Sequence, residues 1–315
     1  MAKLTPTSWI WRDGDFVPWA DAHVHILTHS MQFGSSAFEG IRCYSTPRGP
    51  AIFRLDDHLQ RLINSCRIYH MDVPYSLGEL GFACRELVAK NGLEACYIRP
   101  MVLRGFGAAG MVPFDSPIEV YLPCWEWGVY LGEGALEQGV DACISSWNRM
   151  APNTIPAMAK MAGNYLSGQL IKMEALANGF AEAIALGPDG RLSEGSGQNV
   201  FVVSRGVLYT PPFNGTLLAG ITRDSVMTIA DDLGIRVREQ EMPRESLYSA
   251  DEIFLTGTAS EVTPVRSLDR IRIGNGKRGP VAEALQRRYL DIARGAAPDT
   301  HGWLTYVAQS GGQAL

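Results

Sequence analysis

The sequence lacks the features of membrane-spanning, secreted and nucleic-acid-binding proteins. No stretch of its 315 residues approaches the roughly 18 consecutive apolar residues that a transmembrane helix requires. The N-terminus has no basic segment followed by an apolar one, so we expect no signal peptide. The formal net charge is −5 and lysine and arginine form no basic run, which argues against a nucleic-acid partner. We therefore expect a cytoplasmic protein without a membrane or nucleic-acid partner.

Redox-active cysteine pairs are also absent. All six cysteines fall in the first half of the chain, and none belongs to a CxxC pair. Several lie in apolar periodic segments, so we interpret them as reduced, buried thiols. Apolar residues make up 46% of the sequence and charged residues 19%, as in an ordinary globular protein with a substantial core.

The sequence has little support for a metal site. His23, His25 and His29 resemble a ligand cluster, and the first two share one strand face. No matching arrangement of cysteine or acidic residues accompanies them. We therefore favour structural histidines and expect no metal.

A GxGxxG pattern occurs at 105–110, after a predicted strand, and such a pattern can open a dinucleotide-binding fold. The helix that should follow is prevented by Pro113 and Pro117. We therefore interpret this segment as a flexible, glycine-rich loop, and a dinucleotide oxidoreductase as a remote alternative.

Hydrophobic periodicity predicts helices and strands in both halves of the chain. Helices are expected over 56–69, 76–92, 163–177, 222–233 and 281–293, with a capping box at Ser76 and an N-cap at Thr222. Strands are expected over 51–54, 95–104, 118–124, 141–147, 181–186, 199–204 and 252–255. An irregular stretch near 125–134 predicts a junction. We divide the chain into a small α/β N-terminal domain over 1–127, a linker over 128–136 and a large C-terminal domain over 137–315.

Lys160 stands in an unusual local setting. Small apolar residues flank it, and no acidic residue lies within six positions on either side. A lysine in such a setting can lose solvation, lower its pKa and become a nucleophilic amine suited to a Schiff base. The alternative is a lysine at a helix end whose ammonium group reaches water. The local sequence leaves both interpretations open.

Other segments carry groups that suit a phosphorylated carbonyl cofactor. The turns at 220–222 and 256–259 offer hydroxyls and backbone amides to an anion, and Arg61 could add a charged donor. Glu194 follows a predicted turn, and a carboxylate is what the ring nitrogen of a pyridine cofactor requires. Each of these features alone is equally compatible with ordinary turn, cap or surface chemistry.

Together these segments resemble the branched-chain amino acid aminotransferases, which are class IV (fold-type IV) enzymes dependent on pyridoxal 5′-phosphate. The resemblance covers nearly the whole chain and looks closest to the bacterial members. It is carried by the segments 38–44, 58–62, 97–100, 145–149, 151–165, 193–195, 211–212, 218–223, 244–248 and 257–259. It implies an α+β fold of two domains, with the cofactor in the cleft between them.

The resemblance also implies the cofactor site. Lys160 would be the catalytic residue, forming the Schiff base and moving the proton of the substrate α-carbon. Glu194 would pair with the pyridine nitrogen, and Tyr165 would bond the phenolic oxygen. The phosphate would be held by Arg61, Ile221, Thr222 and Thr258, and Leu218, Gly220 and Gly257 complete the cofactor-binding set.

Substrate recognition is implied in the same way. The amides of Thr258 and Ala259, helped by Tyr97, would receive the α-carboxylate, and Arg99 would meet the distal carboxylate of glutamate. An apolar wall with one arginine at its rim suits both an aliphatic side chain and glutamate. The wall would consist of Phe38, Trp127, Tyr130 and Ala259, with Gly40 leaving room for the substrate.

One position departs from the family pattern: Phe33 stands where bacterial members usually have tyrosine. The missing hydroxyl removes a polar partner for a substrate carboxylate, so activity toward glutamate and 2-oxoglutarate is left open. A D-amino acid or (R)-amine transaminase of the same fold is the alternative function, and a non-enzymatic relative is a further one. The resemblance implies a homodimer, with the 105–112 loop closing over the neighbouring subunit, and bacterial relatives often form hexamers.

Overall fold

The computed structural model describes residues 4–127 and 134–307, and these residues form two compact units. Unit 1 contains 134–158 and 164–290, and unit 2 contains 4–127, 159–163 and 291–307. The change near residue 128 lies beside the predicted linker. Two segments differ from the predicted contiguous division, because 159–163 and the end of the chain belong with the N-terminal half. Tyr130 lies outside the described residues.

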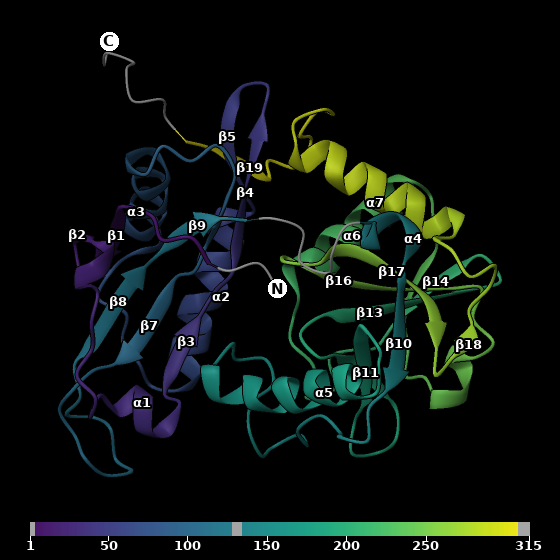
Figure 1. Cartoon of the computed structure of the whole chain (residues 1–315), viewed down its shortest axis with the longest axis horizontal. Helices are drawn as coiled ribbons and strands as arrows, with labels where there is room; N and C mark the ends of the chain where they lie inside the picture. Colours follow the sequence, from purple (N-terminus) through teal and green to yellow (C-terminus); the bar gives the residue numbers. More distant parts are fainter. Residues whose placement is uncertain (1–3, 128–133, 308–315) are drawn as a thin grey trace. The chain divides into compact units, whose positions relative to one another are not determined.

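Unit 2 is built on two antiparallel sheets (Figure 1). The first has the strand order β2-β1-β8-β7-β3 and the second the order β19-β5-β4-β6-β9. Their strands are β1 (Trp9–Arg12), β2 (Asp15–Pro18), β3 (Ser36–Phe38), β4 (Ile41–Thr46), β5 (Gly49–Phe53), β6 (Cys96–Ile98), β7 (Met101–Arg104), β8 (Ile118–Leu122), β9 (Cys124–Glu126) and β19 (Leu304–Tyr306). The predicted strands 95–104 and 118–124 are each divided between the two sheets at a proline, Pro100 and Pro123. Proline has no amide hydrogen for the ladder, so each strand changes sheets there.

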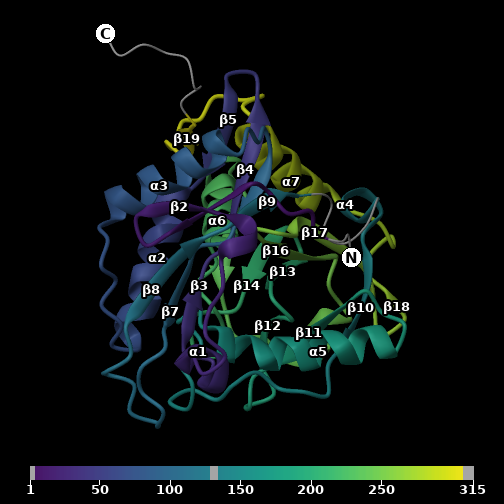
Figure 2. The same cartoon turned by 60° about the vertical axis from the view of Figure 1, so that its left-hand side comes forward.

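Two helices cover these sheets, α2 (Leu55–Ile68) and α3 (Leu77–Lys90), and they lie side by side (Figure 2). The predicted capping box is confirmed: the Ser76 hydroxyl accepts from the amide of Glu79, and the Glu79 carboxylate accepts from the amide of Ser76. On α2, Leu59, Leu62 and Cys66 are completely buried. Burying each leucine contributes about 1.5–3 kcal/mol. Another side of α2 carries polar residues, among them Ser65, that face the 159–163 segment of Lys160.

The short helix α1 (His29–Phe33) ends at Gly34, whose φ of 66° suits glycine. The predicted loop at 105–110 is confirmed, since no helix follows it before β8. One predicted structural histidine, His29, contacts Ser35 and Gly110 through its two ring nitrogens. All six cysteines are free and buried.

Unit 1 is built on a nine-stranded mixed sheet of order β12-β11-β10-β17-β16-β13-β14-β15, with β18 paired to β17 (Figure 1). The strands are β10 (Val140–Ile144), β11 (Glu182–Leu186), β12 (Leu192–Gly195), β13 (Asn199–Ser204), β14 (Val207–Thr210), β15 (Val237–Glu239), β16 (Glu252–Gly257), β17 (Glu261–Leu268) and β18 (Ile271–Arg272). Pairs β10–β11, β10–β17 and β14–β15 are parallel. Completely buried Val200, Phe201, Phe254 and Leu255 fill the centre.

The remaining helices of the described chain are α4 (Ala135–Gln138), α5 (Tyr165–Ala177), α6 (Ile221–Asp232) and α7 (Pro280–Ala293), with short 3₁₀ turns at Trp19–Asp21, Ala162–Asn164 and Arg244–Leu247. The predicted N-cap at Thr222 is wrong, because extended Gly220 caps α6 and Thr222 lies inside its first turn. Within the described residues, no helix has the length and apolar character needed to cross a membrane.

Candidate active site

Lys160 is held in unit 2 by its backbone. Its carbonyl oxygen accepts from the amide of Phe38 at 3.0 Å, and its own amide donates to the Ser65 hydroxyl at 2.9 Å. An isolated antiparallel bridge pairs Met161 with Ala37 of β3. The lysine therefore lies between the end of β3 and the polar face of α2, two elements whose hydrophobic sides are buried elsewhere.

The side chain of Lys160 is only partly exposed, and its Nζ lies 4.7 Å from the centre of the Phe38 ring. Desolvation lowers the pKa of Lys160 from 10.5 to about 8, and attraction by Glu39 opposes this shift. A neutral, nucleophilic fraction of the amine is therefore present near neutral pH. Of the two interpretations of this lysine, the structure supports the desolvated amine rather than the solvated surface cation.

Four other predicted site residues gather around Phe38 in unit 2. The Arg99 guanidinium lies 5.0 Å from the Phe38 ring and 5.2 Å from the Tyr97 ring, and Tyr97 stacks on Trp127 at 4.5 Å. Gly40 makes room for Tyr97 itself, because a Cβ there would lie 1.7 Å from the tyrosine hydroxyl oxygen. The buried Nε of Arg99 has no hydrogen-bond partner among the described residues, as expected of a group that awaits an anionic ligand.

Arg61 reaches the same region from α2, but its partner is one that the sequence did not indicate. Its Nε and Nη2 donate to Glu39 at 2.6 and 2.9 Å. His58, one turn earlier on α2, lies 2.7 Å from the same carboxylate. We call Phe38, Glu39, His58, Arg61, Ser65 and Lys160 the Lys160 cluster.

Phe33 lies in the same unit and is 43% exposed, with its ring 4.6 Å from that of His29. The next residue, Gly34, packs on the segment of Lys160: a Cβ there would lie 3.2 Å from the Cα of Gly163. Phe33 is therefore the last residue of α1, and the residue after it contacts Gly163, at the end of the 159–163 segment that carries Lys160.

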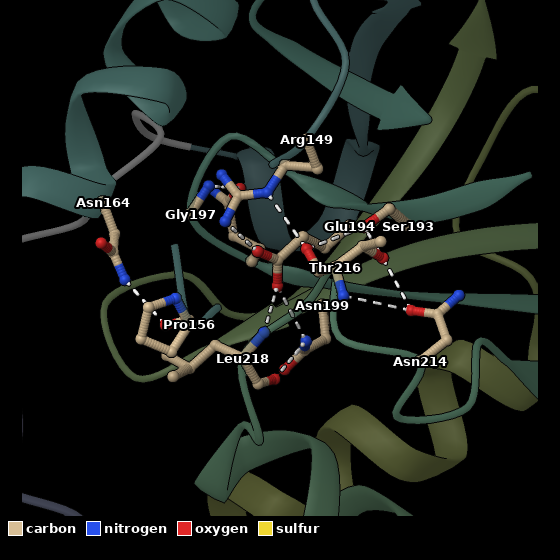
Figure 3. A network of polar contacts seen from close by, with 11 residues as sticks. Arg149, Pro156, Asn164, Ser193, Glu194, Gly197, Asn199, Asn214, Thr216 and Leu218 are labelled. Carbon is tan, nitrogen blue, oxygen red and sulfur yellow. Dashed lines mark hydrogen bonds and ion pairs between the residues drawn. The ribbon is translucent and has the colours of Figure 1, made fainter. Parts of the chain in front are cut away.

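Glu194 belongs to unit 1, where it is buried on β12 (Figure 3). Arg149 forms an ion pair with its Oε1 at 2.6 Å, while Asn199 Nδ2 and the Leu218 amide donate to Oε2 at 3.2 and 3.1 Å. Asn199 also donates to the Leu218 carbonyl at 3.0 Å. We call Arg149, Glu194, Asn199 and Leu218 the Glu194 cluster. It surrounds a buried carboxylate with donors that fix its orientation, as suits a partner for a protonated ring nitrogen.

The helix α5 packs closely on the loop that follows Glu194. A Cβ at Gly168 would lie 2.2 Å from the Ser196 carbonyl oxygen, so glycine is required for this approach. Tyr165, the first residue of α5, lies next to Gly197 of the same loop. Tyr165 and the loop that follows Glu194 therefore lie close together in unit 1.

Two backbone turns of unit 1 carry the other predicted cofactor residues. Gly220 precedes Ile221 and Thr222 at the N-terminus of α6, and a Cβ at Gly220 would lie 1.9 Å from Asn199 Oδ1. Gly257 is the last residue of β16, and Thr258 and Ala259 begin its connection to β17. The buried hydroxyls of Thr256, in β16, and Ser260, in the connection, have no hydrogen-bond partner among the described residues. These donors fit a phosphate or carboxylate group.

Several residues that complete these clusters were missed by the sequence analysis, namely Glu39, His58, Ser65, Arg149 and Asn199. Glu39, His58 and Arg149 stand inside segments that carried the family resemblance, but nothing local distinguishes their roles. Asn199 and Ser65 are marked only by their spacing, as the first residue of β13 and the residue one turn after Arg61 on α2.

The fold and these donors define an aminotransferase of class IV. The family model described as "Amino-transferase class IV" matches residues 36–268, and the chain belongs to this family. Individual relatives are named for a particular substrate class. The branched-chain-amino-acid aminotransferase of Escherichia coli (strain K12) is 49% identical over 302 residues, covering 96% of this chain and 98% of that protein. The one from Pseudomonas aeruginosa is 44% identical over 298 residues, with 95% and 97% covered.

Solved structures agree. The Escherichia coli branched-chain amino acid aminotransferase has a TM-score of 0.94 and 48% identity, covering 96% of this chain and 100% of that chain. The T.th. branched-chain amino acid aminotransferase complexed with N-(5′-phosphopyridoxyl)-L-glutamate has a TM-score of 0.92 and 46% identity, with 96% and 99% covered. The class IV fold expected from the sequence is confirmed.

Proposed function

We propose that the protein transfers the amino group of L-leucine, L-isoleucine or L-valine to 2-oxoglutarate, with pyridoxal 5′-phosphate as cofactor. The observation that carries this proposal is the partly buried Lys160, whose pKa falls to about 8. Membership of the class IV family and the names of the relatives support the substrate class. The reaction has two half-reactions, in which the amino acid first leaves its nitrogen and a 2-oxo acid then collects it.

The residues present fit this cofactor. Lys160 offers an amine, Glu194 a carboxylate for the ring nitrogen, and Tyr165 a hydroxyl for the phenolic oxygen. The α6 turn and Arg61 offer donors for the phosphate. We propose that the Lys160 cluster and the Glu194 cluster each contribute residues to cofactor binding. When bound, pyridoxal 5′-phosphate supplies an electron-withdrawing ring that draws negative charge from the substrate α-carbon.

Each side chain then has a defined task. The neutral amine of Lys160 accepts the proton of the substrate α-carbon and returns it later in the half-reaction. Arg149 and Asn199 keep the Glu194 carboxylate oriented, so that it can accept a hydrogen bond from the ring nitrogen. The amides of Thr258 and Ala259 receive the α-carboxylate.

The aromatic residues around Arg99 in unit 2 select the substrate. Phe38 and Trp127 offer apolar surface to an aliphatic side chain, and Arg99 offers a cation to glutamate. Because Arg99 already lies against aromatic rings, it can stay there for leucine and pair with a carboxylate for glutamate.

A substrate panel tests this proposal. Purified protein with pyridoxal 5′-phosphate should use L-leucine with 2-oxoglutarate, followed by coupled detection of glutamate. D-alanine and (R)-1-phenylethylamine serve as donors for the alternative functions of the fold. A higher kcat/KM for either of these than for L-leucine would contradict the proposed substrate class.

We further propose a homodimer at least, with the 105–112 loop covering the site of the neighbouring subunit. The apolar side chains of Phe106, Met111 and Val112 are 54%, 81% and 67% exposed, which supports a covering role. Sedimentation equilibrium would measure the assembly, and a strict monomer with full activity would contradict this role. The six free thiols support placement in the reducing cytoplasm.

A further inference from the structure

Glu39 is the centre of the Lys160 cluster, although the proposed function gives it no task. Its side chain is completely buried, between the two residues Phe38 and Gly40 that belong to the predicted substrate pocket. Its amide donates to the Pro100 carbonyl at 2.8 Å, so its backbone is fixed as well. A completely buried carboxylate is rare in proteins and requires both pairing and hydrogen bonds.

Both carboxylate oxygens of Glu39 have partners. Oε1 accepts from Arg61 Nε at 2.6 Å, and Oε2 accepts from Arg61 Nη2 at 2.9 Å. Two parallel bonds of this kind fix the plane of the guanidinium group, which a single bond does not. Oε2 also contacts His58 Nδ1 at 2.7 Å and accepts from the Gly40 amide at 3.1 Å.

The charges within the cluster agree with this pairing. Burial by itself would raise the pKa of Glu39, but Arg61 and His58 outweigh it and hold that pKa well below its ordinary value. Burial lowers the pKa of His58, so the ring is neutral near neutral pH and donates through Nδ1. Glu39 therefore carries its negative charge near neutral pH.

The cluster connects Glu39 to Lys160 by short covalent and hydrogen-bonded routes. The Phe38 amide, one residue before Glu39, donates to the Lys160 carbonyl. The Ser65 hydroxyl donates to the Arg61 carbonyl at 2.8 Å and accepts from the Lys160 amide at 2.9 Å. A shift of the Glu39–Arg61 pair would therefore disturb the hydrogen bonds of both the amide and the carbonyl of Lys160.

Four charged or titratable groups act on the amine of Lys160. Glu39 and Tyr97 favour its protonated form, while Arg61 and Arg99 disfavour it. Glu39 is the largest of these four influences. Loss of this one carboxylate would leave two arginines acting on a desolvated amine.

We propose that Glu39 is a positioning residue that holds the Arg61 guanidinium in one orientation and stabilises the protonated amine of Lys160. The part that concerns Arg61 rests on the proposed function, in which Arg61 binds the cofactor phosphate. The part that concerns Lys160 does not, because it is a property of the protein without cofactor.

The first test titrates Lys160 in the apoprotein. The rate of acylation of Lys160 by an amine-directed reagent is followed by mass spectrometry against pH, with exposed Lys277 as internal reference. In the wild type the midpoint should lie near 8. In Glu39→Gln it should fall by on the order of one pH unit, since an attractive charge is lost. A merely structural role would loosen the unit and move the midpoint up, toward that of a solvated lysine.

The second test isolates the orientation of Arg61. The ratio of the dissociation constants of pyridoxal and pyridoxal 5′-phosphate measures what the phosphate group contributes to binding. Glu39→Asp keeps the charge but shortens the side chain, so it should keep the Lys160 midpoint and lower this ratio by about tenfold. The control is Glu119→Gln, which changes a carboxylate of the same unit bonded to Tyr121 and should leave both measurements unchanged.

The outcomes are decisive. A midpoint in Glu39→Gln that stays at or rises above the wild-type value overturns the proposal, as does a wild-type ratio in Glu39→Asp. If circular dichroism shows that Glu39→Gln does not fold, the Glu39→Asp measurements alone decide. Failure of the wild type to bind pyridoxal 5′-phosphate would instead contradict the proposed function, and the Lys160 titration would still stand.

Discussion

The Lys160 cluster and the Glu194 cluster each contain a buried glutamate–arginine ion pair, but the pair acts on a cation in the first and on a carboxylate in the second. In the first, burial makes a cation give up its proton more easily, and the carboxylate of Glu39 limits how far this goes. In the second, a carboxylate is buried, and Arg149, Asn199 and a backbone amide surround it with donors. Each cluster contains one ion pair between glutamate and arginine. The difference lies in which partner is meant to react.

The two ion pairs differ in which residue is the functional group and which one supports it. In the Glu194 cluster the glutamate is the functional group and the arginine supports it. In the Lys160 cluster the arginine is the predicted phosphate ligand, and the glutamate supports it while acting on the lysine. Buried ion pairs contribute little net stability but hold charge and orientation well. Changes on the two sides should therefore differ in whether they affect chemistry, stability or pH dependence.

The largest effect is expected from Lys160→Ala. Loss of both the attachment point and the proton acceptor should lower transamination by at least about 10³-fold. The near-ultraviolet to visible absorption band of lysine-bound cofactor should disappear, as spectrophotometry would show. Lys277→Ala, at an exposed position, is the matched control and should keep both. Full turnover without the band would refute the role of Lys160.

Arg149→Met should act mainly on stability. It leaves Glu194 buried without its cation, at a cost of about 3 kcal/mol in the free energy of unfolding. Urea unfolding of the apoprotein would measure this. The double variant with Glu194→Gln should lose less than the sum of the two single variants, because the partners act as one unit. Additive losses would mean that the pair seen in Figure 3 is energetically unimportant.

The pH dependence of stability should reveal the lowered pKa of Lys160. The pKa of Lys160 is about 8 in the folded protein and near 10.5 when solvated, so the unfolded chain binds this proton more tightly. Protonation therefore favours unfolding, and the penalty is complete below pH 8 and vanishes as pH rises to about 10.5. Relative to Lys160→Met, the wild-type apoprotein should gain up to roughly 3 kcal/mol across this window. A difference between the two that does not change with pH would contradict the lowered pKa.

The smallest effect is expected from Phe33→Tyr. The ring is 43% exposed, so a hydroxyl should change the free energy of unfolding by less than about 0.5 kcal/mol. If this position serves a substrate carboxylate, KM for glutamate should fall several-fold while KM for L-leucine changes little. Steady-state kinetics with both donors would test this, and Phe16→Tyr, on β2, is a control. Equal changes for both donors would place Phe33 outside substrate recognition.

The longer helices were predictable from the sequence, but many of the strands were not. The helices α2, α3, α5, α6 and α7 follow from apolar periodicity and caps, because these depend on residues three or four positions apart. The exchange of strands between sheets at Pro100 and Pro123 was not predicted. The strands that were not predicted are β1–β4, β12, β14, β15, β17, β18 and β19. β19 pairs with β5, about 250 residues earlier in the chain, and no local pattern specifies such a partner.

The sequence by itself determined the kind of chemistry. An apolar setting for Lys160, a glutamate after a turn and amide-rich turns already indicate a carbonyl cofactor, since residue type sets which bonds a group can form. Only the tertiary structure decided how each group is tuned. Glu39 acts on Lys160 across more than 120 positions of sequence, and Arg149 on Glu194 across 45, because burial and charge depend on distance in space rather than along the chain.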